Sequence, residues 1–301
     1  MALTLTEAAK LSNDVVRQGV IETIIKDSPV LQVLPFQEIV GNSLTYNREN
    51  ENAEPSFYDV GDTWTEGTPT FTQKTATLRI LGTDADVDQY LATTRSNVND
   101  LEAEVLALRA KAVRHKFDKT FVSGDVSVEA DGFDGIREMI VTDGPASQVV
   151  TNGADGGALT LEKMDELMDV VKGRTPDIVL MSKRERRSLA KLARTAGYRL
   201  ETNRDEFGRP FETYAGVRIA VHDDVATDEE VGESSDCGTI YVLSLGPDGI
   251  AGLTGPGGLQ VEELGPLETK DAHRWRIKWY VTVALYNALT VGAMTGVRPV
   301  A

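Results

Sequence analysis

Histidine, cysteine and clustered carboxylates are the side chains of this chain that could carry out catalysis or bind a metal. The 301 residues include three histidines, His115, His222 and His273, and a single cysteine, Cys237. One cysteine cannot form a disulfide within the chain or supply a multi-cysteine zinc site. We interpret Cys237 as a small residue without a chemical role.

The most metal-like group is His222-Asp223-Asp224, because imidazole and carboxylate are good ligands for transition metals. Three consecutive residues at a strand end cannot all point at one ion, since successive side chains face opposite ways. The sequence also lacks a Gly-x-Ser-x-Gly elbow, a Gly-x-x-x-x-Gly-Lys phosphate loop and a dinucleotide fingerprint. We therefore predict no catalytic residue, no cofactor and no metal site, and a protein that is not an enzyme.

One run of positive charge requires a partner. Ser182 and Glu185 have capping-box spacing, and the first turns of the helix that they open carry a cluster of four cations: Lys183, Arg184, Arg186 and Arg187. The helix dipole disfavours cations there by about 0.3–1 kcal/mol each. An acidic face of a neighbouring copy, such as residues 223–236, nucleic-acid phosphate and plain solvation are the three alternatives, and we favour the neighbouring copy.

Composition limits the class of protein. With 41% hydrophobic residues the chain can bury a core of one large domain or two modest ones. The net charge of -16 argues against a nucleic-acid-binding protein as a whole, because phosphate would be repelled. Neither a membrane span nor a secretory signal is apparent, so we expect no contact with a membrane.

The first 35 residues are predicted to form an arm of short helices. Thr4 and Glu7 have capping-box spacing, and an apolar stripe that includes Val20, Ile21 and Ile24 follows. Packing of this stripe on the chain's own domain and packing on a neighbouring subunit are equally open.

Two predicted strands, residues 38–48 and 70–81, flank a long excursion over residues 47–69. The excursion combines acidic residues such as Glu54 and Asp62 with three aromatic residues, Phe57, Tyr58 and Trp64. Long loops of this kind are usually functional, and exposed aromatic side chains favour burial against another protein. We therefore expect an extended hairpin that contacts a neighbouring subunit.

A long helix is predicted over residues 99–121, opened by Asn99 with Glu102 at capping-box distance. It carries two apolar stripes on nearly opposite sides: Leu101, Val105, Leu108 and Ala112 on one, and Leu106, Ala110, Val113, Phe117 and Phe121 on the other. Such a helix is expected to be a spine that is buried between two layers.

The remainder indicates a mixed α/β region followed by a long strand. Predicted elements are a helix at 160–173, a strand at 177–181, the helix after Ser182, and strands at 217–221, 239–245 and 258–263, with a turn at 255–258. Over residues 271–285, apolar residues alternate with arginine, lysine and other polar residues. This last strand is expected to face a core on one side.

This order of parts resembles that of the major capsid proteins of tailed bacteriophages, which have the Hong Kong 97-type fold. The resemblance covers essentially the whole chain: an arm, an extended loop at 47–69, a spine helix at 99–121, the stretch at 213–219, and a return strand at 271–285. It implies an α+β fold with an N-terminal arm at 1–35, a peripheral domain at 36–123, an axial α/β domain at 124–265, the return strand of the peripheral domain within 266–287, and a C-terminal axial segment at 288–301.

The resemblance also implies a function. A protein of this kind self-assembles as pentamers and hexamers into an icosahedral head shell, located in the virion and made in the host bacterial cytoplasm. It encloses double-stranded DNA without sequence-specific binding. Because the chain starts at the arm, we expect a separate scaffolding protein, together with a portal and a possible decoration protein.

Some relatives join their subunits through a lysine–asparagine bond. Lys74 lies near the base of the loop, but residues 268–278 contain no asparagine, so covalent cross-linking is not expected. The alternatives are an encapsulin-like nanocompartment shell and, remotely, a soluble acidic hydrolase.

Overall fold

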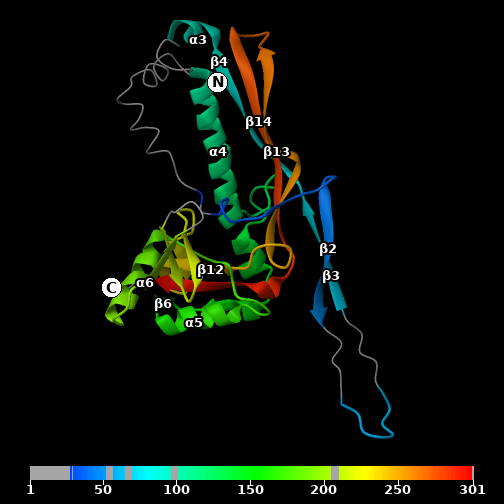
Figure 1. The fold of residues 1–301 in the computed structure, drawn as a ribbon, viewed down its shortest axis with the longest axis vertical. Coiled ribbons are helices and arrows are strands. Elements are labelled where there is room, and N and C mark those ends of the chain that lie inside the picture. The colour runs from blue at the N-terminus through cyan, green and yellow to red at the C-terminus, as the bar shows by residue number, and fades with distance from the viewer. Residues whose placement is uncertain are drawn as a thin grey trace.

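The computed structural model of the chain describes residues 28, 30–51, 57–64, 70–95, 101–204 and 210–299. Its strands form a four-stranded sheet, a nine-stranded sheet and a two-stranded hairpin. Figure 1 shows an elongated molecule in which helix α4 runs along the smaller sheet, the larger sheet and its helices gather at one end of α4, and the hairpin projects from the side.

The smaller sheet has the order β1-β13-β14-β4, with bounds Phe36–Glu38, Ile250–Pro266, Ala272–Leu285 and Arg79–Asp88. Strand β14 confirms the expected final strand, because Ile277 and Val281 are buried while Arg276 on the other face is exposed. Helix α3 (Gln89–Arg95) follows β4 and precedes α4 (Leu101–Ser123). The alternation along β14 therefore gives the sheet its one apolar face.

The larger sheet has the order β5-β15-β12-β7-β10-β9-β8, with β11 on β12 and β6 on β15. Its strands are β5 (Val149–Thr151), β6 (Gly157–Ala158), β7 (Ile178–Met181), β8 (Glu201–Arg204), β9 (Pro210–Tyr214), β10 (Val217–Val221), β11 (Glu229–Val231), β12 (Ser234–Leu243) and β15 (Val291–Arg298). Two helices pack on it, α5 (Leu161–Val170) and α6 (Lys183–Thr195). Short helical turns are η1 (Glu138–Thr142), η2 (Ala146–Gln148) and η3 (Ala288–Thr290).

Local sequence explains the ends of these elements. The Thr160 hydroxyl accepts a hydrogen bond from the Lys163 amide and begins α5, and the Ser182 hydroxyl accepts from the Glu185 amide and begins α6. Between β9 and β10, Ala215 and Gly216 have φ of 48° and 80°. Positive φ at both positions is what a two-residue hairpin turn requires, and it explains the glycine before the apolar run of β10.

The hairpin consists of β2 (Ser43–Glu51) and β3 (Thr70–Thr77), in antiparallel register. The prediction of one strand over residues 70–81 was wrong, because β3 ends at Thr77 and the chain passes at Leu78 into β4 of the four-stranded sheet. The strand expected at 38–48 is likewise interrupted between β1 and β2. At both breaks the chain changes its pairing partner, and the Leu78 amide bonds the Asn42 carbonyl where the two breaks meet.

The turn expected at residues 255–258 is also corrected. These residues lie inside β13, which pairs with β14 on both sides of them, with a register shift between Thr254 and Leu259. Gly257 and Gly258 have φ of 84° and 59°, so the glycines permit a bulge in a continuous strand. Residues 250–266 thus belong to the four-stranded sheet. The division of the chain into domains remains a prediction.

Helix α4 is buried mainly along one of its two stripes. Val113, Phe117 and Phe121 are buried, and on the other stripe Val105 is buried beside β4, but Ala112 is exposed. The expectation of burial on two sides is therefore wrong at Ala112, because the sheet of this chain covers only one flank of the helix there. Asn99, the expected helix cap, lies outside the described residues.

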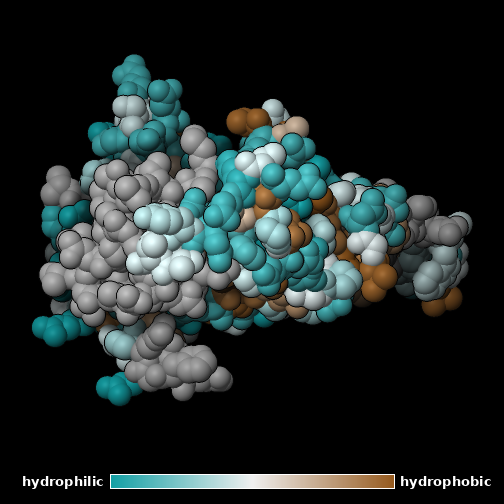
Figure 2. Space-filling model, turned by 90° about the horizontal axis from the view of Figure 1, so that it is seen from above, coloured by the Kyte–Doolittle hydropathy of each residue, from teal (hydrophilic) through white to brown (hydrophobic). Residues whose placement is uncertain are grey.

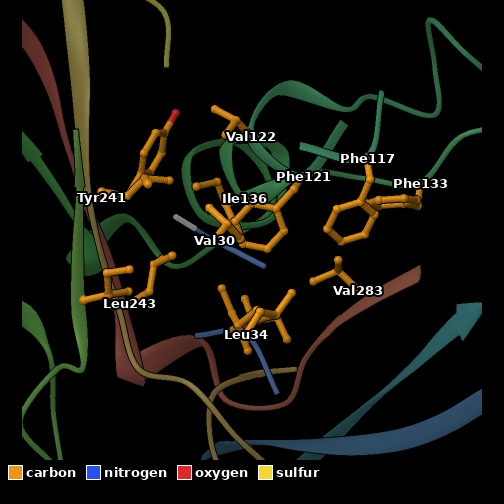
Figure 3. Close-up of a cluster of buried hydrophobic side chains, with 14 of the residues drawn as sticks. Val30, Leu34, Phe117, Phe121, Val122, Phe133, Ile136, Tyr241, Leu243 and Val283 are labelled. Carbon is orange, nitrogen blue, oxygen red and sulfur yellow. The ribbon is translucent and has the colours of Figure 1, made fainter. Parts of the chain in front are cut away.

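One apolar cluster joins the two sheets. It includes Ile277 and Val283 from the four-stranded sheet and Leu180 and Tyr241 from the nine-stranded sheet. Figure 3 shows Val30, Phe121 and Ile136 in the middle of this cluster, between Tyr241 on one side and Val283 on the other. A second cluster lies between the nine-stranded sheet and the helices α5 and α6.

Candidate functional surfaces

The described end of the arm is fixed in the core of its own chain. Val30 and Leu34 are 4% and 5% exposed, and the Ser28 hydroxyl donates a 2.6 Å hydrogen bond to Asp118 Oδ1 on α4. Burial raises the pKa of the Asp118 carboxyl, against the lowering effect of the Ser28 hydrogen bond. The expected arm contacts Val20, Ile21 and Ile24 lie outside the described residues.

The base of the hairpin is attached to the body by polar and aromatic contacts. The Arg48 guanidinium donates hydrogen bonds to the Leu285 carbonyl, and the rings of Tyr46 and Tyr286 meet edge to face with centroids 5.0 Å apart. Lys74 Nζ lies 3.8 Å from Asp143 Oδ2. These contacts fix where the hairpin leaves the body.

The tip of the hairpin presents aromatic side chains to solvent. The rings of Tyr58 and Trp64 stack with centroids 4.4 Å apart, and the Asp59 amide donates a 2.7 Å hydrogen bond to Asp62 Oδ2. Phe57 is fully exposed and Trp64 is 78% exposed. Figure 2 shows brown, hydrophobic atoms at the tapered end of the molecule, on the side to which the hairpin projects in Figure 1. Glu54 lies outside the described residues.

The basic helix turn has partners within its own chain. Lys183 Nζ lies 2.9 Å from Asp223 Oδ1, and Arg184 Nη1 donates hydrogen bonds of 2.7 Å to the carbonyls of Thr227 and Asp236. Residues 223–236 were expected to offset this charge from a neighbouring copy, but they do so for Lys183 and Arg184 within the same chain. The folded topology, which brings the β10–β12 connection to the start of α6, is not visible in the sequence.

The next turn of α6 borders a groove that sequence reasoning did not find. Arg186 pairs with Glu212 at 3.1 Å, whereas Arg187 has no ion-pair partner among the described residues. The concave surface between α6 and the strands β8 and β9 has a volume of about 1220 Å³, and Arg194 and Arg199 also line it. The β8–β9 pairing brings these arginines together, so spacing along the chain gave no signal for the groove.

The groups considered for chemistry are structural in their surroundings. No cluster of three metal-ligating side chains occurs among the described residues. His222 is buried, and its Nδ1 accepts a hydrogen bond from the Asp224 amide. Burial raises the pKa of the Cys237 thiol and of the Glu185 carboxyl. None of the helices in the described ranges combines the length and the apolar character of a membrane span.

Solved structures confirm the Hong Kong 97-type fold. A chain of the holo-SrpI encapsulin complex from Synechococcus elongatus superimposes with a TM-score of 0.70 at 17% identity, covering 93% of this chain and 95% of that one. The capsid of cyanophage A-1(L) gives 0.68 at 13% identity, covering 91% and 93%. Mycobacterium phage Bobi gives 0.61 at 16% identity, covering 94% and 99%. Such low identities establish the fold alone.

The sequence itself decides between the two kinds of shell. No curated protein matches the chain. The family of the SU10 major capsid protein matches residues 38–298, which is most of the chain and both of its sheets. This match favours the capsid over the nanocompartment and the hydrolase that the sequence had left as alternatives. The chain belongs to the SU10 major capsid protein family: it is a structural protein of the virion that forms the shell of a phage head.

Proposed function

We propose that the β2–β3 hairpin is the part by which this capsid protein clasps its neighbour in the shell. The observation that carries the proposal is the exposure of Phe57 and Trp64 at the hairpin tip. Burying a large apolar side chain contributes about 1.5–3 kcal/mol, and a tip that leaves two in solvent gains this only from another molecule.

The tip is ordered for such a contact before it meets a partner. Tyr58 and Trp64 already stack, and the Asp59 and Asp62 turn holds the intervening residues, so little conformational freedom remains to be lost on binding. Glu54 and Asp62 add negative charge to the aromatic surface. We therefore assign the contact to Phe57, Tyr58, Trp64, Glu54 and Asp62, and expect an apolar partner surface with a basic rim.

The arm is proposed as a second contact between subunits. Its described end is anchored through Ser28, Val30 and Leu34, so residues before it start from a fixed point on α4. Val20, Ile21 and Ile24 form an apolar stripe that a neighbouring subunit would cover. A shell of identical chains needs different contacts in pentamers and hexamers, and arms and hairpins supply contacts that can adapt.

The proposed division of the subunit follows its two sheets. A peripheral domain would comprise residues 36–123 and 266–287, and an axial domain residues 124–265 and 288–301. The position of α4 beside β4 and β14 and the pairing of β15 with β12 support this division. The pairing of β13 with β14 instead supports placing residues 250–266 with the peripheral part.

Further partners are proposed from the family. A separate scaffolding protein and a portal would act in assembly, and a decoration protein is a possible addition. Double-stranded DNA would be enclosed without sequence-specific binding, which the net charge of -16 supports. The same charge predicts that any contact with DNA is confined to local basic surface.

The hairpin proposal is tested by the double substitution Phe57→Ala with Trp64→Ala. We expect a folded subunit that forms no closed shells, because the apolar contact is lost while no buried side chain changes. Val128→Ala with Tyr198→Ala is the matched control, since Val128 is 84% and Tyr198 is 42% exposed elsewhere on the surface. Circular dichroism checks folding, and electron microscopy counts particles. Normal particles from the hairpin variant would refute the clasp.

A further inference from the structure

The groove beside α6 concentrates positive charge that the chain itself does not neutralise. Arg187, Arg194 and Arg199 line it and are exposed, and none of them has an ion-pair partner among the described residues. The paired Arg186 and Glu212 stand at its edge. Like charges brought together in this way repel one another, so an acidic partner would stabilise the groove.

The floor of the groove narrows the class of partner. It is apolar, with Ala190, Leu200 and Ile219 among the lining residues. A phosphate backbone would satisfy the arginines but would leave this floor uncovered, and the chain's charge of -16 would oppose its approach. An acidic stretch of polypeptide, with carboxylates at the rim and carbon atoms over the floor, complements both parts.

The chain offers such a stretch at residues 228–233, around β11. Asp228, Glu230 and Glu233 are exposed, and none of their carboxylates forms an ion pair among the described residues. The pairing of β11 with β12 holds the segment in place. Its flanks already bind cations of α6, through Asp223 on Lys183 and Asp236 on Arg298 and Arg184. Acidic residues 228–233 remain available for a second molecule.

We propose that the arginine groove of one subunit (Arg187, Arg194 and Arg199) receives the acidic segment 228–233 of the next subunit around a ring. The two surfaces differ, so the contact is head to tail, and head-to-tail contacts close into rings when the rotation permits. The proposal rests on the shell-forming function. It assigns the contact within a ring to charge, whereas the hairpin clasp is apolar.

Charge reversal and charge exchange test this contact. Arg187→Glu with Arg194→Glu is expected to lower the yield of closed particles about tenfold or more, and Glu230→Lys with Glu233→Lys to do the same, because like charges would then face each other. A chain carrying all four changes restores opposite charges and is expected to regain particles to within about twofold of the original yield. Lys119→Glu with Lys172→Glu, at exposed lysines outside the groove, is the control for total charge.

Mixing the two reversed chains adds a test that misfolding cannot imitate. Each contact in the mixture has opposite charges only if the two chains alternate, which an even-numbered ring permits and a five-membered ring does not. We expect six-membered rings in sheets or tubes, without closed shells.

Three results would overturn the proposal. One is full particle yield from either reversed chain, and another is failure of the four-change chain to assemble although circular dichroism shows it folded. The third is normal shells with less enclosed nucleic acid, which would identify the groove as a DNA contact. Loss of particles in the hairpin variant with normal charge exchange would leave this contact intact, so the two proposals fail separately.

Discussion

Replacing Phe117 with alanine perturbs the place where the spine helix meets both sheets. The Phe117 side chain is completely buried. Its ring contacts four others, with centroid distances of 4.9 Å to Trp279, 5.7 Å to Phe133, 6.0 Å to Phe36 and 6.2 Å to Phe121. These rings come from β14, the loop after α4, β1 and α4 itself, so a cavity at Phe117 has walls that belong to separate elements.

The expected loss of stability is large. Truncation of a buried phenylalanine costs about 3–5 kcal/mol, with larger values where the surroundings cannot collapse. Since the rings around Phe117 are held by different elements, we expect about 4 kcal/mol. That is a large part of the roughly 5–15 kcal/mol by which a domain is stable, and it corresponds to a melting temperature lower by roughly 10 °C.

Urea unfolding of unassembled subunits, followed by tryptophan fluorescence and circular dichroism, measures this loss. Trp279 is buried and donates a hydrogen bond from Nε1 to Thr254, so its emission reports on the same cluster. Phe71→Ala is the matched control, because Phe71 is 62% exposed and its loss should cost less than about 0.5 kcal/mol. A loss below about 1 kcal/mol for Phe117→Ala would refute the argument that this ring joins the sheets.

Two further predictions concern pH. Asp118→Asn keeps an acceptor for Ser28 but cannot ionise; because burial raises the pKa of Asp118 above 3.8, ionisation opposes folding as the pH rises, so the variant should be at least as stable as the original at pH 7 and lose its advantage below pH 3.8, and a thermal melt showing clear destabilisation at neutral pH would contradict this. Asp86 accepts hydrogen bonds of 2.6 and 2.8 Å from Arg274, which lower its pKa below 3.8, so its contribution is present above that pH and is lost in more acidic solution; Asp86→Asn should cost about 1 kcal/mol at pH 7 and nothing after full protonation, and an equal loss at both pH values would count against the ion pair.

Elements with strong local periodicity could be predicted from the sequence. The twofold alternation over residues 271–285 predicted β14 to within one residue, because one face meets a core and the other does not. Ser182 marked the start of α6 in the same way, since its hydroxyl caps the helix locally. The long helix was predicted as well, with its described end two residues beyond the expected one.

Features that depend on distant partners could not be predicted. Nothing near Leu78 signals that the chain leaves one sheet for another, because the change is set by pairing with residues far along the chain. The glycines at 255–258 satisfied a turn as well as a bulge, and only β14 on both sides decides between them. Partners for Lys183 and Arg184, and the groove formed with Arg199, likewise arise from tertiary contacts.

The single apolar cluster shared by the two sheets bears on how a closed container of these subunits curves. Because Ile277 and Tyr241 lie in one packed interior, bending the subunit between its sheets would open voids among side chains such as Phe121. The subunit therefore acts as a stiff tile. Differences in curvature between the vertices and the flat faces of the container must then be taken up at the joints between tiles.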